Sequence, residues 1–453
     1  MLRQNKEYSQ FIEPVFETPE GLGNWFGYYN YDPLNYDQTK MLCNRTKNDA
    51  CEIKKGMTIE VGYYDIPTGA WHHIGETDSY NWQQGAMMQW LPGNGNEDKV
   101  IYNCSKNNHL ISRIHDIKTC ENREIDWSIY GLTPDGKKSI ALNMERSYWC
   151  RAYHYVSVAN EAYDVRVPED DGIFEIDLWN NKRKRIVDIA DVIAIDKEPY
   201  FDKAKHWLEH IMISPSGKRF CFLHRFTIGN LNDYETRLFI ANIDGSNLQL
   251  VADWRKYFLS HFGWDGDDAF VIYSYESTIH AKVLSSLMAS GSNKTSFISP
   301  AKNIYRKLPK PIQRWISTLR SHGNQEQTTY YQYFTLQGCY FELTKLFKNK
   351  EFEVDGHPSF TKDRQYMITD SYPDKNKYRR LLIYDKSIGV ATYLGRLNAA
   401  LEGKAVCDLH PKLSRNNDYL MIDTAYNGKH NMILFKLNWR VIKEYFSKIK
   451  SVQ

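Results

Sequence analysis

The chain has 453 residues, with 58 Lys and Arg against 55 Asp and Glu, and its formal net charge is +3. A balance this close to neutral, without a dense basic stripe, does not suggest a nucleic-acid binder. No apolar run approaches the roughly 20 residues that span a bilayer, and the N-terminal segment MLRQNKEYSQFIEPVFETPE lacks the apolar stretch of a secretion signal. The eight cysteines form no CxxC pair, so we expect reduced thiols in a cytoplasmic protein.

One sequence unit recurs seven times along the chain. Its first half is a strand, a turn and a second strand, as in residues 209–224, and its second half is a hairpin with Asp, Gly or Asn at the turn, as in residues 237–253. The first halves lie at 30–44, 87–103, 129–143, 210–224, 261–274, 357–370 and 410–424, and the final second half lies at 431–446. Seven copies of a four-stranded unit predict an all-β fold, a seven-bladed β-propeller that forms one domain over residues 1–453.

Two insertions interrupt the repeat, at residues 144–171 in the third blade and at residues 277–335 in the fifth. Within the second, residues 302–320 place apolar side chains at helical spacing with Lys and Arg between them, although Pro309 and Pro311 limit a helix to the second half. Such a basic amphipathic helix packs on the propeller with its charges in solvent, or it makes peripheral contact with an anionic membrane.

The first position of each unit begins the innermost strand, at the mouth of the central channel. Its occupants in chain order are Tyr31, Met87, Ile129, His210, His261, His357 and His410. Equivalent positions of a propeller converge on its axis, so four histidines on successive blades predict a shared site.

Neutral imidazoles from several blades are a typical donor set for a transition metal, with Zn²⁺ or Mn²⁺ as the expected ion. The expected ligands are His261, His357, His410 and Cys407. The fourth ligand is Cys407 or the adjacent Asp408, where a thiolate favours zinc and a carboxylate widens the choice; otherwise Cys407 is a small buried side chain. Asp355 is expected to orient His357 by a hydrogen bond to the ring nitrogen that does not bind the metal.

A second group of candidates lies beside His210, which is the first of the four histidines along the chain. The pair His224 and Arg225 follows one strand later, and strand parity leaves open which of the two faces the channel. An arginine there suits a sugar carboxylate because its guanidinium binds both oxygens. In the third-blade insertion, Arg151 and Tyr155 are candidates for substrate contact and proton transfer, or they belong to an aromatic cap.

Two Asn-Trp pairs precede innermost strands, in GNWFGYYNYDP and in NWQQGAMMQW. The candidate sugar-binding residues that they supply are Asn24, Trp25, Trp82, Gln83 and Gln84. Their amides and indole rings suit hydrogen bonding and stacking on a sugar, and the alternative is that the Trp side chains pack between blades.

Five stretches lie between residues 81 and 424, outside the two insertions: NWQQGAMMQWLPG, HIMISPSGKRFCFLHRF, DGHPSFTKDRQYMITDSYPD, RRLLIYDKSIG and CDLHPKLSRNNDYLMIDT. Together they resemble the propeller polysaccharide lyases of the oligogalacturonate lyase and ulvan lyase groups. The resemblance implies β-elimination on a uronate-containing glycan. A metal or an arginine then offsets the uronate carboxylate, a Tyr, His or Arg removes the C5 proton, and an acid assists departure of the C4 oxygen.

The resemblance also assigns individual residues. It implies metal positions at His357, His410 and Cys407, although the oligogalacturonate group has Gln where this chain has Cys407. It implies active-site roles for His210 and Arg225, with His261 as a ligand or a catalytic group. The matching motifs do not place the catalytic tyrosine, and we expect Tyr155, in the third-blade insertion, to take that role.

We therefore predict a metal-dependent carbon–oxygen lyase that acts as a monomer on a uronate-containing glycan. The alternative is a non-catalytic propeller that binds a glycan or serves as a scaffold in a surface-polysaccharide pathway, because propellers host many functions.

Overall fold

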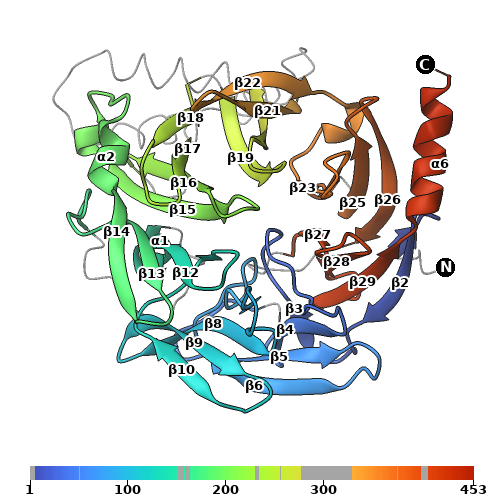
Figure 1. The fold of residues 1–453 in the computed structure, drawn as a ribbon, viewed down its shortest axis with the longest axis horizontal. Helices are drawn as coiled ribbons and strands as arrows, with labels where there is room; N and C mark the ends of the chain where they lie inside the picture. The colour runs from blue at the N-terminus through green and yellow to red at the C-terminus, as the bar shows by residue number, and fades with distance from the viewer. Residues whose placement is uncertain are drawn as a thin grey trace, which may run out of the picture.

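The computed structural model describes residues 6–49, 51–150, 158, 164–229, 234–255, 257–276, 329–374, 376–398 and 407–452. Its seven antiparallel sheets form a ring around a central axis (Figure 1). The predicted all-β propeller with seven four-stranded blades is confirmed.

The first five blades take their strands in chain order from the axis outward. Blades one and two are β3 (Gly23–Trp25), β4 (Lys40–Thr46), β5 (Ile59–Asp65) and β6 (Trp71–Thr77), then β7 (Gln89–Trp90), β8 (Lys99–Lys106), β9 (His109–Asp116) and β10 (Asn122–Ile125). Blades three and four are β11 (Gly131–Leu132), β12 (Lys138–Leu142), β13 (Gly172–Asp177) and β14 (Lys182–Asp188), then β15 (Lys205–Ile213), β16 (Arg219–Thr227), β17 (Glu235–Asn242) and β18 (Gln249–Asp253). Blade five is β19 (Tyr257–Trp264), β20 (Ala269–Glu276), β21 (Thr329–Gln337) and β22 (Tyr340–Phe347).

The last two blades are completed by the N-terminal strands. Blade six is β23 (Ser359–Phe360), β24 (Tyr366–Asp370), β25 (Tyr378–Asp385) and β26 (Val390–Asn398), with β1 (Lys6–Tyr8) as a fifth strand. Blade seven is β27 (Lys412–Leu413), β28 (Tyr419–Thr424), β29 (Asn431–Leu437) and β2 (Ile12–Glu17). Pairing of β2 with β29 closes the ring between the two ends of the chain.

The prediction that residues 431–446 form a strand hairpin is wrong. The strand β29 ends at Leu437, and the Asn438 side chain then caps the helix α6 (Trp439–Lys450) by accepting a hydrogen bond from Val441 N. Ile442 and Phe446 on α6 are buried against the outer part of blades six and seven. The fourth strand of blade seven therefore comes from the N-terminus, and the segment after β29 is free to form a helix.

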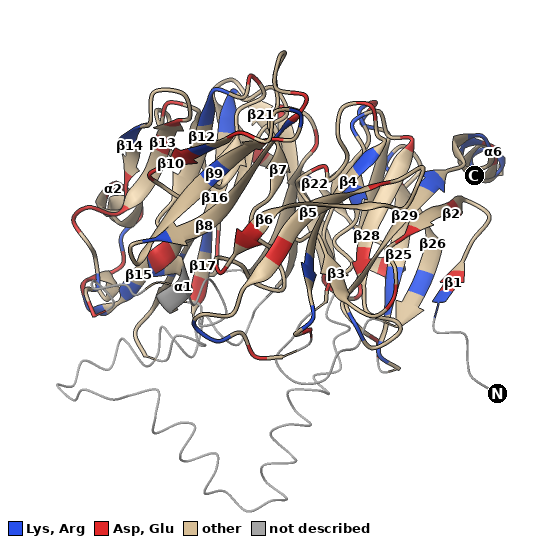
Figure 2. Ribbon diagram, turned by 90° about the horizontal axis from the view of Figure 1, so that it is seen from below, with Lys and Arg blue, Asp and Glu red and all other residues tan. Residues whose placement is uncertain are grey.

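The other helices among the described residues are short and lie between strands. They are α1 (Met144–Cys150), α2 (Ile189–Ala194), η1 (Phe201–Lys203) and η2 (Lys350–Phe352). No described helix is long and apolar enough to cross a membrane. Seen from the side, α6 lies outside the ring, and acidic and basic residues are interspersed over the described strands and loops (Figure 2).

Both insertions lie mostly outside the described residues. The helix α1 occupies the start of the first, and the predicted amphipathic segment 302–320 falls entirely within the part that is not described. The strand β21 begins at Thr329, so residues 329–335 belong to blade five.

The predicted start of the inner strand at the histidine positions needs correction. His357 and His410 come two residues before β23 and β27. His210 and His261 lie inside β15 and β19, at irregularities where two residues of the inner strand oppose one residue of its partner. A bulge of this kind re-aims a side chain, and in both strands it occurs at the histidine.

Candidate functional site

Three of the four predicted histidines meet at the axis of the propeller. The ring centroids of His261 and His357 are 3.9 Å apart, and those of His357 and His410 are 4.3 Å apart. The three side chains come from blades five, six and seven, so neighbouring blades bring one residue each to the same point.

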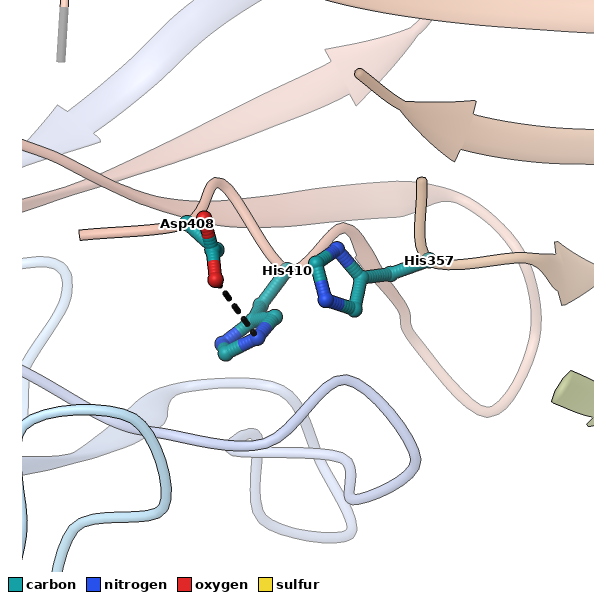
Figure 3. Close-up of side chains that lie close together, drawn as sticks. All are labelled: His357, Asp408 and His410. Carbon is teal, nitrogen blue, oxygen red and sulfur yellow. Dashed lines mark ion pairs between the residues drawn. The ribbon is translucent and has the colours of Figure 1, made fainter. Parts of the chain in front are cut away.

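A potential metal-binding group lies within this cluster (Figure 3). It consists of His357, Asp408 and His410, whose candidate ligand atoms all lie within 4.8 Å of one another. Asp408 Oδ2 lies 4.0 Å from His410 Nε2. All three side chains are buried, so an ion bound there would be largely shielded from water.

Hydrogen bonds fix the orientation of both ligand histidines. Nδ1 of His410 lies 3.0 Å from the carbonyl oxygen of Gly27, which can only accept, so Nδ1 carries the proton. Nδ1 of His357 lies 2.8 Å from Asp370 Oδ1. Both Nε2 atoms are buried without a hydrogen-bond partner among the described residues. Metal-bound histidines typically have their other ring nitrogen held in this way, so the donor set fits a divalent cation.

The charge states of these groups also fit a cation. Burial, followed by the charges of His357 and Lys412, holds the pKa of His410 well below its ordinary value, which keeps the imidazole in the neutral form that metals bind. Burial opposes ionisation of Asp370, but the charge and hydrogen bonds of His357 outweigh it and lower the pKa of Asp370 to about 2.

Asp355 orients His261 rather than His357. Its Oδ2 atom lies 3.0 Å from His261 Nδ1, and Asp370 takes the predicted place behind His357. Burial alone would lower the pKa of His261, but the Asp355 carboxylate outweighs burial and raises it. His261 touches the metal-binding group through His357 without being part of it.

Of the two candidates for the fourth ligand, Asp408 belongs to the group and Cys407 lies beside it. Burial raises the pKa of the Cys407 thiol well above its ordinary value, so the protonated form dominates. Asp408 is held by Arg379, whose Nη1 lies 2.7 Å from Oδ1, and by Gln83, whose Nε2 donates to Oδ2 at 3.0 Å.

His210 forms a second centre on blade four. Its Nε2 atom lies 3.4 Å from Glu209 Oε2, and Arg225 Nε lies 3.3 Å from the same oxygen. The Arg225 guanidinium packs over the Tyr234 ring. His224 is instead buried in a parallel stack with His206, so Arg225 is the member of the pair that reaches the site.

Two residues that the sequence analysis missed join these centres. Tyr28 stacks parallel on His210 with ring centroids 5.2 Å apart, and its ring meets His410 edge-on at 5.4 Å. Tyr29 packs against His357 at 5.0 Å. Both come from the loop between β3 and β4, which enters the centre of the ring. The sequence feature that could have indicated these two tyrosines is the aromatic-rich run GYYNYDP, which begins with Gly27.

Gly27 is required where this loop passes the connection between β6 and β7. Its φ is +128°, and a Cβ atom there would lie 2.5 Å from the carbonyl carbon of Gln84. Any other residue would therefore displace the loop and the carbonyl that orients His410.

The predicted sugar-binding residues separate into two sets. Trp25 and Trp82 are buried and pack together with His430, with 4.9 Å between Trp82 and each of the other two rings. Asn24 is buried too, and its Oδ1 accepts a hydrogen bond from Tyr64. Gln83 and Gln84 reach the central site, because Gln83 donates to Asp408 as described and the Gln84 amide lies 3.4 Å from His210 Nδ1.

Arg151 and Tyr155 lie outside the described residues.

Comparison with known proteins supports the fold. No protein-family model matches the sequence, and a search of curated proteins finds no relative. Among solved structures, an oligogalacturonate lyase in complex with manganese is similar with a TM-score of 0.60 and 15% identity over 95% of each chain. An oligogalacturonate lyase from Vibrio parahaemolyticus has a TM-score of 0.57 and 14% identity over 95% of this chain and 96% of its own. The chain thus shares the propeller fold of these lyases.

Proposed function

We propose that this protein is a metal-dependent lyase that cleaves a uronate-containing glycan by β-elimination. The observation that carries the proposal is the pair of buried Nε2 atoms on His357 and His410. Both rings are oriented by a contact at Nδ1, and both lie close to Asp408. The shared fold supports it, since one of the similar lyases was solved with manganese.

His357, His410 and Asp408 would hold the ion, with His261 adjacent. Two imidazoles and a carboxylate suit Mn²⁺ or Zn²⁺, and a thiolate is not needed. A divalent ion bound there supplies positive charge that offsets the uronate carboxylate and acidifies the C5 hydrogen. Gln83 and Arg379 keep the Asp408 carboxylate turned toward the histidines.

His210 is the proposed proton acceptor. Glu209 lies beside its Nε2 atom, which favours the proton on that nitrogen and leaves the lone pair on Nδ1. The contacts of Nδ1 with Gln84 and Tyr130 are long, at 3.4 Å each, so a substrate can replace them. A Glu209 carboxylate beside the ring would stabilise the imidazolium that forms, and Arg225 Nε lies 3.3 Å from the same Glu209 oxygen.

The surroundings favour a small substrate in a reducing compartment. The candidate ligands are almost fully buried, which suits a short oligosaccharide better than a long polymer. All eight cysteines are free, which supports a cytoplasmic location.

The proposal is tested by incubating the protein with a panel of uronate glycans. The elimination product carries a conjugated double bond, and its ultraviolet absorbance reports turnover. We expect product from at least one glycan, and loss of the activity when a chelator removes the metal. If metal-loaded protein yields no product from any of them, lyase activity is rejected in favour of a glycan-binding or scaffold propeller.

A further inference from the structure

The loop that carries Tyr28 is firmly held on blade seven. Asp423 accepts hydrogen bonds from Phe26 N at 2.9 Å and from Gly27 N at 3.2 Å. The buried Lys412 ammonium lies 2.8 Å from Asp423 Oδ2 and completes this anchor. The backbone that leads into Tyr28 is therefore held by contacts that do not involve the Tyr28 side chain.

The two neighbouring tyrosines use their hydroxyl groups differently. The Tyr29 hydroxyl donates to Phe262 O at 2.5 Å and accepts from Phe262 N at 3.3 Å. The Tyr28 hydroxyl is buried, with no hydrogen bond of ordinary length to any described residue, although Tyr29 is close enough to influence its pKa. A buried hydroxyl is costly without a partner, and a substrate oxygen would provide one.

Tyr28 stands between the two centres of the site. One face of its ring lies parallel to His210, the proposed proton acceptor, and the ring also meets His410 of the metal-binding group. A tyrosine hydroxyl keeps its proton at neutral pH, so the Tyr28 side chain can give a proton there.

We infer that Tyr28 is the proton donor to the departing C4 oxygen of the glycan. This inference rests on the proposed lyase function. The C5 proton passes to His210 Nδ1, and the C5–H electron pair forms the C4=C5 double bond. The C4–O bond breaks with its electron pair on oxygen, which takes the phenolic proton of Tyr28. The phenolate then regains a proton from the solvent, and the His210 imidazolium releases one to it.

Tyr28→Phe removes the donor while keeping the ring that stacks on His210. On a natural glycan we expect kcat of the manganese-loaded, full-length variant to fall by about 10²–10⁴-fold, the range for general acid catalysis. Its Mn²⁺ affinity and melting temperature should stay close to wild type, because the loop is anchored through its backbone.

A second substrate separates proton donation from a structural effect. A uronate with an electron-poor aryloxy group at C4 needs no acid, so most of the loss in Tyr28→Phe should disappear on it. The matched control is Tyr29→Phe, which breaks the bond to Phe262 O and should lower the melting temperature, with any loss of kcat equal on both substrates.

Each outcome has one meaning. A Tyr28→Phe variant as active as wild type, or one impaired equally on both substrates, overturns the inference alone and leaves the lyase function standing. A wild-type protein that produces no unsaturated uronate overturns both.

Discussion

One position of the repeat carries opposite chemistry on the two sides of the ring. In blades two and three it is Met87 and Ile129, which are 1% and 0% exposed within one hydrophobic cluster. In blades six and seven it is His357 and His410, which are 0% and 2% exposed and present Nε2 atoms without a hydrogen-bond partner in the described chain. The propeller therefore buries this position in all four blades. The residue type decides whether the buried group is apolar or can bind a metal.

The backbone supports the same conclusion. Met87 and His410 both adopt a left-handed φ, of 54° and 45°, which is uncommon for either residue type. The geometry that aims a side chain at the axis is therefore shared by an apolar blade and a histidine blade. The apolar side stabilises the fold, whereas the histidine side leaves polar atoms unsatisfied, which is the usual cost of a binding site.

The largest expected effect compares His357→Ala with Met87→Ala. His357→Ala should abolish stoichiometric metal binding, because the group loses a central ligand. Met87→Ala should keep the metal and lower the free energy of unfolding by about 2–5 kcal/mol, the usual cost of a large-to-small change in a core. Metal analysis and denaturant unfolding of both variants test the comparison, and equal metal content in the two would contradict it.

The arc of histidines could be predicted from sequence because it follows from the repeat itself. A residue type recurring at one position of four successive units is visible without any coordinates, and ring closure places those residues together. The same reasoning placed His210 and Arg225 on one side of the site, but the parity of β16 had to be seen before Arg225 could be separated from His224.

The remaining parts of the site have no counterpart in the other repeats. Tyr28 and Tyr29 lie on a loop that is peculiar to blade one, so no register argument locates them. Asp370 lies on β24, one strand away from His357, and only the folded sheet shows that it approaches Nδ1. Which of the adjacent residues Cys407 and Asp408 points toward the histidines depends on the path of a connection outside any strand.

A smaller loss of metal affinity is expected when the carboxylates that hydrogen-bond the histidines are changed. The comparison of two such variants tests whether His261 is a metal ligand or a catalytic group. Asp370→Asn removes the charge that holds His357, and loss of such a partner typically weakens metal affinity by about 10–100-fold. Asp355→Asn makes the same change behind His261. Because His261 lies outside the metal-binding group, we expect a smaller loss from Asp355→Asn when Mn²⁺ binding is measured by calorimetry. Equal losses would make His261 a ligand.

The smallest effect concerns a partly buried carboxylate away from the axis. Burial raises the pKa of Glu235, at the start of β17, to about 7, whereas the histidine beside Asp370 lowers the pKa of that carboxyl to about 2 despite burial. The ordinary pKa of Glu in the unfolded chain is about 4.3. At a pH between that value and 7, the folded protein therefore keeps a proton on Glu235 that the unfolded chain has lost. The contribution of this group to stability is complete below about pH 4 and declines as the pH rises through 7. Glu235→Gln, which stays neutral, should match wild type in melting temperature at pH 4.5 and exceed it at pH 8. A variant that gains nothing at pH 8 would mean that Glu235 is not buried enough to resist ionisation, and that charged groups in this propeller are tolerated inside the blades as well as at the axis.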